Sequence, residues 1–390
     1  MLLILAVIYI VFISLGLPDS LFGVAWPVVH TEFGVSESFA SVYSIIISLC
    51  TGGVSFLSGR LIRKFGTSKV TFASILLTAA GLIGISFAPN LVVMMLCSVI
   101  MGYGAGAIDT GLNSFVSLHY KAHHMNWLHC FWGVGVTTSP LIMSVFLGEG
   151  GGNWRNGYRV VAMLQLAIGL IVLFSLKKWR SIEKNEAQQQ TQEEKSDAKI
   201  SDIIKIKGVI TSIASLGFYC SMEFLLGTWG ATYAVNAFSI APDEAAKWVS
   251  LYYGGIMLGR MIAGFISLKV SDKNLIRGGI FTSLLGIIVF ALPLGKISMA
   301  GFILIGIGFG PIFPSVLHSV PERFGGTYAA DITGYHMGGA YAIGFTVQMI
   351  YGYVASWTTF GITPFVLMAL CAGLIALNEI ALKKVKRVTK

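Results

Sequence analysis

The chain has 390 residues, of which 55% are apolar and 12% are charged, and its mean hydropathy is +0.77. This composition excludes a water-soluble globular protein, because too few polar residues remain to cover a surface exposed to water. The formal net charge of +9 does not indicate a nucleic-acid partner, since the basic residues gather in alternate loops between apolar stretches. We therefore expect a polytopic membrane protein.

Twelve apolar stretches approach or exceed the roughly 20 residues that a helix needs to cross a bilayer. The predicted spans are 2–29, 38–58, 68–88, 91–118, 125–147, 157–176, 208–236, 245–267, 276–294, 297–318, 327–355 and 362–382. Strands of a membrane β-barrel would be about 10 residues long and would alternate apolar with polar residues. The sequence therefore predicts an all-α fold with twelve transmembrane helices, the first of them a retained anchor rather than a cleaved signal peptide.

The basic residues predict the orientation of these spans. One set of alternate loops, with the C-terminal tail, holds 22 Lys and Arg, whereas the opposite set holds 4, and Arg260 lies inside a span. By the positive-inside rule, both termini are expected in the cytoplasm. The short loops and the absence of an N-glycosylation motif favour the plasma membrane of a bacterium.

Residues 177–207 form the one long polar interruption and predict a partly helical cytoplasmic linker. They separate a predicted N-terminal bundle, 1–176, from a C-terminal bundle, 208–390, each with six helices. The two bundles carry matching sequences at a nearly constant offset, since 306 − 102 = 204, 223 − 19 = 204 and 331 − 126 = 205. Two parallel repeats of this kind resemble the plan of major facilitator transporters, whose substrate site lies near mid-membrane.

Several carboxylates and amides interrupt the apolar spans, and they carry the functional prediction. A carboxylate in hydrocarbon costs roughly 2.5 to 3.5 kcal/mol, so it usually faces a polar cavity or a partner. Asp109 and Asn113 lie four residues apart and share one helix face. Asp19 follows Pro18, which can open the helix locally. The repeat pairs Asp19 with Glu223, whereas Asp109 falls opposite an apolar residue, so proton chemistry is expected in the N-terminal half.

The sequence around these residues resembles the fucose:proton symporter family of the major facilitator superfamily. The likeness is most specific in Ile108–Val116, in Asn126–Gly135 and around Asp19. It implies that Asp19 and Asp109 take up the proton and contact the sugar, with Asn126 as a substrate ligand. The chain departs from the family where Asp109 replaces a glutamate, and from the superfamily where Arg63 replaces the aspartate of the loop between the second and third spans.

A second group of residues has the chemistry of a sugar site, in which aromatic rings meet the C–H faces of a sugar and polar groups meet its hydroxyls. We predict substrate contacts from the following residues, in addition to Asp19: Asn113, Asn126, His129, Tyr219, Glu223, Trp229 and His336. Each also has a structural interpretation, as a packed histidine or an aromatic residue of a helix interface. Arg260 is interpreted as a snorkelling residue or an ion-pair partner in preference to a substrate ligand.

An enzyme is not expected. His119, His123 and His124 match one histidine box of membrane di-iron oxygenases, but that chemistry needs several boxes and the other histidines are isolated. The five cysteines lie in apolar spans without CxxC spacing, so neither a metal site nor a disulfide framework is predicted. We expect no cofactor and no nucleic-acid partner. The expected contacts are the bilayer and a small solute, and the expected state is a monomer.

These observations predict a secondary active transporter, with proton-coupled symport of a sugar or a similar polyhydroxylated solute by alternating access. Two other transporters fit the same residues. A carboxylate with amide oxygens can ligate sodium, which would give a sodium-coupled sugar symporter. An aromatic and methionine-rich interior also suits an efflux antiporter for drugs or metabolites. A transporter-like sensor that binds solute without moving it is a third alternative.

Overall fold

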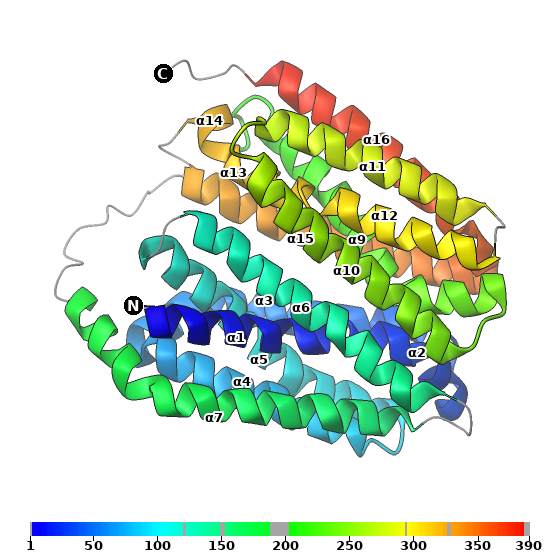
Figure 1. Ribbon diagram of the computed structural model, residues 1–390, viewed down its shortest axis with the longest axis horizontal. Helices are drawn as coiled ribbons and strands as arrows, with labels where there is room; N and C mark the ends of the chain where they lie inside the picture. Colours follow the sequence, from blue (N-terminus) through cyan, green and yellow to red (C-terminus); the bar gives the residue numbers. More distant parts are fainter. Residues whose placement is uncertain are drawn as a thin grey trace. The chain divides into compact units, whose positions relative to one another are not determined.

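The computed structural model describes residues 2–119, 122–148, 153–187, 203–292, 295–325 and 329–385. Helices make up almost all of these residues (Figure 1). They are α1 (Leu2–Asp19), α2 (Leu21–Phe33), α3 (Phe39–Phe65), α4 (Thr67–Ser86), α5 (Leu91–His119), α6 (Ala122–Leu147), α7 (Trp154–Ala187), α9 (Val209–Phe238), α10 (Pro242–Ile266), α11 (Asp272–Ala291), η1 (Gly295–Ser298), α12 (Met299–Phe309), α13 (Ile312–His318), α14 (Val320–Phe324), α15 (Ala329–Trp357), η2 (Phe360–Ile362) and α16 (Thr363–Lys384).

Each of the twelve predicted spans corresponds to one of these helices or to a pair of them. Two spans predicted as single helices are interrupted. The first is divided into α1 and α2 at Ser20, and the tenth into α12 and α13 at Gly310 and Pro311. The sixth span continues as α7 to Ala187, so the start of the predicted linker is helical. Most of the remaining linker, 188–202, lies outside the described residues, and the three-part domain division stays a prediction.

The helices have the composition and exposure of membrane spans. Among the described residues, nine helical segments are long and apolar enough to cross a bilayer, and two shorter apolar ones are Phe39–Val54 and Leu91–Gly106. Large apolar side chains on several helices remain exposed, for example Leu49, Phe174 and Phe281. Lipid is the natural environment for such side chains, since helices satisfy their own backbone hydrogen bonds. The predicted all-α polytopic fold is confirmed.

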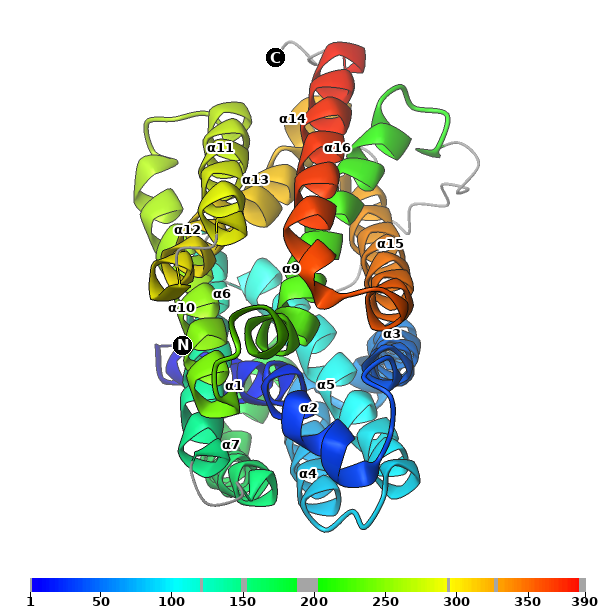
Figure 2. The same ribbon diagram turned by 90° about the vertical axis from the view of Figure 1, so that its right-hand side faces the viewer.

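The chain divides into two compact units, and each unit is built from two separate segments of the chain. Unit 1 comprises residues 1–192 and 230–254, and unit 2 comprises residues 193–229 and 255–390. In unit 1, α4 packs against α5 and α7, α3 against α5, and α1 against α6. In unit 2, α11 lies beside α12 and α16, as Figure 2 shows from the side. Helices α9 and α10 each contribute one part to each unit.

The interruption between α12 and α13 has a local cause. Pro311 has no N–H group, so the carbonyl oxygen of Ile307 loses its helical donor. Gly310 and Ser315 still make helical hydrogen bonds on either side, to Gly306 and to Pro311. The backbone of Gly259 on α10 lies directly against the Ile307 carbonyl, where a side chain would clash. The break in unit 2 is therefore packed closely against α10.

Candidate functional site

Two glycines bring α1 and α6 into backbone contact and so fix the surroundings of Asp19. A side chain at Gly16 would clash with the carbonyl oxygen of Trp132, and one at Gly135 would clash with that of Ile13. Such close approach needs residues without a Cβ atom on both helices. The contact places the end of α1 beside the middle of α6.

Asp19 is the last residue of α1, and its side chain is exposed although its chain neighbours Pro18 and Ser20 are buried. Its Oδ2 atom accepts a hydrogen bond of 2.8 Å from the indole Nε1 of Trp132 on α6. The Trp132 ring in turn packs edge-on against Tyr253, with ring centroids 6.4 Å apart. Unit 1 thus gathers a carboxylate, an indole and a phenol, which is the chemistry that the sequence predicts for a sugar site.

Two carbonyl groups freed by prolines find polar partners next to this group. Pro18 cannot donate to the carbonyl of Ser14, and Gln165 of α7 donates to it from Nε2 at 2.6 Å. Pro140 cannot donate to the carbonyl of Val136, which accepts the hydroxyl of Ser20 at 2.9 Å. Membrane helices tolerate prolines when neighbouring side chains satisfy the freed groups. The interruption after Asp19 is therefore tied to α6 and α7 by hydrogen bonds.

The predicted acid–amide cluster falls partly outside the described residues. The backbone of Asp109 and Asn113 belongs to α5 and that of Asn126 to α6, but their side chains lie outside the described part of the structure. The glycines that continue the Asp109 face, Gly102 and Gly106, pack against α3, where a side chain would meet Cys50 or Thr51. Those glycines therefore serve helix packing. The proton-coupling role of Asp109 stays a prediction.

Glu223 and Arg260 form the corresponding charged group of unit 2. Glu223 on α9 and Arg260 on α10 are both buried, and Oε1 of the carboxylate lies 3.7 Å from Nη2 of the guanidinium. Tyr219 lies one turn earlier on α9, and its ring packs against Phe309 and Phe313 with centroids 5.2 and 6.2 Å apart. Of the interpretations given to Arg260, the ion pair is the one observed. A buried charge pair in aromatic surroundings is costly to form and more costly to break.

The remaining predicted ligands are all packed in helix interfaces. His129 on α6 makes an edge contact with Phe12, with centroids 6.0 Å apart. Trp229 is fully buried against Tyr351 and Phe360. His336 is fully buried and bonded at both ring nitrogens, at 2.9 Å to the Ile332 carbonyl and at 2.8 Å to the Ser212 hydroxyl. These geometries suit structural roles, and substrate contact by these three residues stays a prediction.

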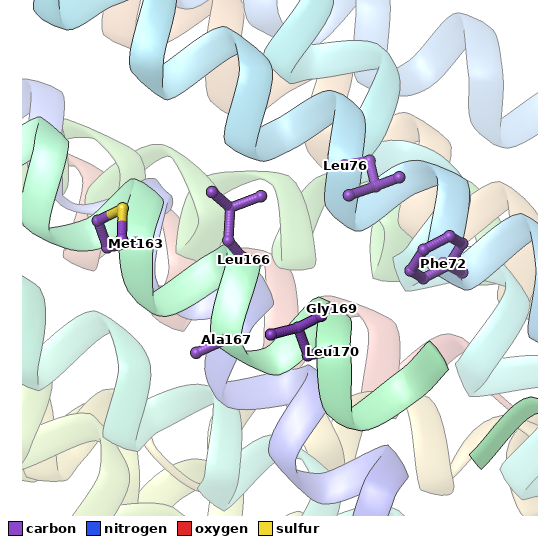
Figure 3. Close-up of a pocket in the computed structure, with 7 residues that line it drawn as sticks. All are labelled: Phe72, Leu76, Met163, Leu166, Ala167, Gly169 and Leu170. Atoms are coloured by element: carbon purple, nitrogen blue, oxygen red, sulfur yellow. The ribbon is translucent and has the colours of Figure 1, made fainter. Parts of the chain in front are cut away.

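An apolar pocket on unit 1 is separate from these groups. It has a volume of about 410 Å³, and Figure 3 shows it lined by side chains of α4 and α7. Its lining residues are Phe72, Leu76, Met163, Leu166, Ala167, Gly169 and Leu170. Leu76, Met163 and Leu170 are exposed, so the pocket belongs to the apolar surface that meets lipid. It offers no polar group to a hydrophilic solute.

Sequence reasoning missed the two aromatic residues of the Asp19 group, Trp132 and Tyr253. Trp132 lies within the segment Asn126–Gly135 but was not among the predicted ligands, since its pairing with Asp19 spans 113 positions of the chain. Gln165 was also missed. A glutamine within an otherwise apolar span, combined with a proline in another span, is the signal that could have found it.

The comparisons with known proteins decide the family. The model of the Major Facilitator Superfamily matches residues 8–349. The chain belongs to the Major Facilitator Superfamily. The predicted membership is thereby confirmed, and so is the prediction of a transporter rather than an enzyme, because the family and the relatives are transporters.

Individual members of the superfamily show how far the likeness extends. The glucose/mannose transporter GlcP of Bacillus subtilis is 26% identical over 326 residues, which cover 79% of this chain and 77% of GlcP. The D-xylose-proton symporter has the same fold, with a TM-score of 0.75, 12% identity, and coverage of 99% and 98%. The transporter FucP in its outward conformation gives a TM-score of 0.67 at 13% identity, with 98% of both chains covered. At such identities the two solved structures support the fold alone.

Proposed function

We propose that this chain is a secondary active transporter that carries a sugar or a similar polyhydroxylated solute by proton-coupled symport. The observation that supports it most directly is the group of Asp19, Trp132 and Tyr253, because an exposed carboxylate hydrogen-bonded to an indole can accept sugar hydroxyls beside a ring face. The names of the similar proteins agree, since they specify glucose and mannose, D-xylose with a proton, and fucose with a proton.

In this proposal, protonation of Asp109 permits the loaded transporter to move between its outward and inward states. Asp19 and Asn126 hold hydroxyl groups of the solute. Neutralising a carboxylate inside the membrane lowers the cost of burying it, so proton binding and conformational change are coupled. Aromatic and polar contacts would come from the remaining predicted ligands, which are Asn113, His129, Tyr219, Glu223, Trp229 and His336.

The proposal includes the setting of the transporter. The charge distribution supports cytoplasmic termini, and the short loops without an N-glycosylation motif support the plasma membrane of a bacterium. The transporter is proposed to act there as a monomer. A proton is the coupling ion, and no cofactor is required. Sodium coupling and efflux of amphipathic compounds are the alternatives that the experiment must separate.

The test is uptake by proteoliposomes under an imposed proton gradient, sodium gradient or no gradient. The solutes are glucose, mannose, xylose, fucose and one lipophilic cation. We expect accumulation of at least one sugar that follows the proton gradient. Accumulation driven by sodium alone would show that sodium, and not a proton, is the coupling ion. Transport of the lipophilic cation without any sugar would show that the solute is not a sugar.

The Asp109→Asn variant tests the coupling step. It should lose gradient-driven accumulation while retaining exchange of labelled for unlabelled sugar, because an amide still binds hydroxyl groups but cannot take up a proton. The matched control is Glu379→Gln, which removes a carboxylate paired with Arg277 on unit 2 and should leave accumulation intact. Unchanged accumulation in Asp109→Asn would remove Asp109 from the coupling role.

A further inference from the structure

One end of unit 2 contains a polar pocket that the proposed transport mechanism does not use. Its volume is about 250 Å³, and it is formed by the start of α11, the junction of α13 and α14, and the end of α16. The polar residues that line it are Ser271, Asp272, Lys273, Ser319, Glu322 and Arg323. These residues come from the basic loops, on the side of the membrane that the charge distribution assigns to the cytoplasm.

Arg323 gives the pocket its chemistry. The residue is 8% exposed, and its Nη2 atom is buried without a hydrogen-bond partner in the described part of the chain. The carboxylates of Asp272 and Glu322 act on it electrostatically, and burial lowers the pKa of Arg323 below its usual range. A buried guanidinium without a bonded anion is costly, so the pocket is suited to a ligand that supplies one.

The start of α11 supplies further donors to the lining of the pocket. This helix has 20 residues, and its N-cap Ser271 makes no capping hydrogen bond through its side chain. The first N–H groups of a helix lack helical partners and favour anions, with the helix dipole acting in the same direction. Lys273 lies in the first turn of α11 and also lines the pocket. Arg323, Lys273 and the helix terminus therefore converge on one space.

The carboxylates do not cancel this positive character. Asp272 is bonded to His318, whose Nδ1 lies 2.8 Å from Oδ2, and Glu322 is exposed to solvent. The turn that leads into α9 also packs here, because the backbone of Gly208 meets Val385 and Lys384. That contact adds a group of cationic side chains at the same end of unit 2, namely Lys205, Lys207, Lys383 and Lys384.

We propose that this pocket binds a phosphate group. A phosphate offers several acceptor oxygens to a guanidinium, an ammonium and backbone N–H groups at once. The phosphate could come from an anionic lipid headgroup in the adjacent leaflet or from a soluble phosphate ester. In either case it stabilises the contacts between α11, α14 and α16 and leaves the sugar site untouched.

The test measures thermal unfolding of the purified full chain with two probes. In phosphatidylcholine nanodiscs, millimolar inorganic phosphate is added against matched chloride. Separately, nanodiscs that contain phosphatidylglycerol are compared with phosphatidylcholine alone. We expect at least one probe to raise Tm by about 2 °C or more, since a ligand that binds only the folded state stabilises it. A response to inorganic phosphate indicates a soluble ligand, and a response to phosphatidylglycerol alone indicates a lipid.

Variants locate the effect. Arg323→Gln should abolish the shift, and Lys273→Ala should reduce it and serves as the second variant if Arg323→Gln does not fold. Arg277→Gln is the matched control, because Arg277 lies on the same helix, pairs with Glu379 and does not line the pocket. No shift with either probe, or an equal shift in the Arg323, Lys273 and Arg277 variants, would overturn the proposal.

Discussion

Equivalent spans of the two repeats differ in whether their helix is interrupted. In unit 1 the span that carries Asp19 is interrupted at Ser20, whereas the equivalent helix α9 continues through Glu223. The offset of 204 aligns Pro18 with Met222, since 222 − 18 = 204. In the other pair of equivalent spans, the interruption lies in unit 2. Pro311 lies between α12 and α13, whereas its counterpart Ala107 lies within the continuous helix α5.

In both pairs the interrupted span carries a proline beside the interruption and its repeat equivalent carries none, although a proline alone does not interrupt a span, since Pro140 lies within the continuous helix α6. At Pro18 the freed carbonyl is bonded by Gln165, and the adjacent carboxylate Asp19 is exposed. At the equivalent place in unit 2 no backbone group is freed, and the carboxylate Glu223 is buried beside Arg260. One repeat thus leaves its acid exposed, and the other pairs its acid with a base.

The largest effect is expected from removing the base of that pair. Arg260→Met takes the positive charge away from buried Glu223 and should lower the free energy of unfolding by about 3 to 5 kcal/mol. Adding Glu223→Gln should restore much of the loss, because no buried charge then remains. Thermal or denaturant unfolding of the single and the double variant measures this. If the double variant is as unstable as the single one, the two charges do not compensate each other.

The next effect concerns the exposed acid of unit 1. Asp19→Asn should reduce sugar uptake by about tenfold to a hundredfold, because a charged acceptor for hydroxyl groups is replaced by a neutral one. Stability should change little, since the side chain is exposed. Uptake and Tm measured on the same preparation separate the two effects. Normal uptake in this variant would mean that the carboxylate does not contact the solute.

A smaller effect tests the link between Pro18 and Gln165. Gln165→Leu should cost about 1 to 2 kcal/mol, because the buried carbonyl of Ser14 loses its donor. In a Pro18→Ala background the same change should cost less, since the backbone N–H at position 18 can then bond that carbonyl. The double-mutant cycle is measured by unfolding. Equal costs in both backgrounds would show that Gln165 does not compensate for the proline.

The smallest effect serves as a baseline for the buried pair. Arg277 donates to Glu379 from Nε at 2.7 Å and also from Nη2, but the two side chains are 45% and 34% exposed. Arg277→Gln should therefore cost less than about 1 kcal/mol. A loss as large as that of Arg260→Met would mean that burial is not what distinguishes the two ion pairs.

Much of the fold could be predicted from the sequence because each span is continuous, apolar and about 20 residues or longer. The equivalence of Asp19 and Glu223 followed from the repeat. The local opening of the helix at Pro18 followed from the missing N–H group of proline. The interruption at Pro311 was not predicted, although the same argument applied to it. A proline in any apolar span leaves a carbonyl group without its helical donor, but the prediction applied this argument to the first span only.

The contacts of the site could be predicted only in part. That Arg260 belongs to an ion pair was one of three interpretations, but its partner Glu223 lies 37 positions away on another helix, so composition and spacing did not identify it. The indole that meets Asp19 likewise depends on the approach of α1 to α6 through Gly16 and Gly135. Periodicity shows which residues share a face of one helix, whereas partners across helices depend on packing.

The divided tenth span also bears on how the protein is made. Residues Met299–His318 have a mean hydropathy of 1.9 over their most apolar window, so the insertion machinery meets one ordinary apolar segment. The close packing of α10 against the division at Gly310 and Pro311 is therefore expected to form after insertion, when Gly259 meets the Ile307 carbonyl. A larger residue at Gly259 should leave synthesis and membrane integration normal and impair only the later assembly of unit 2.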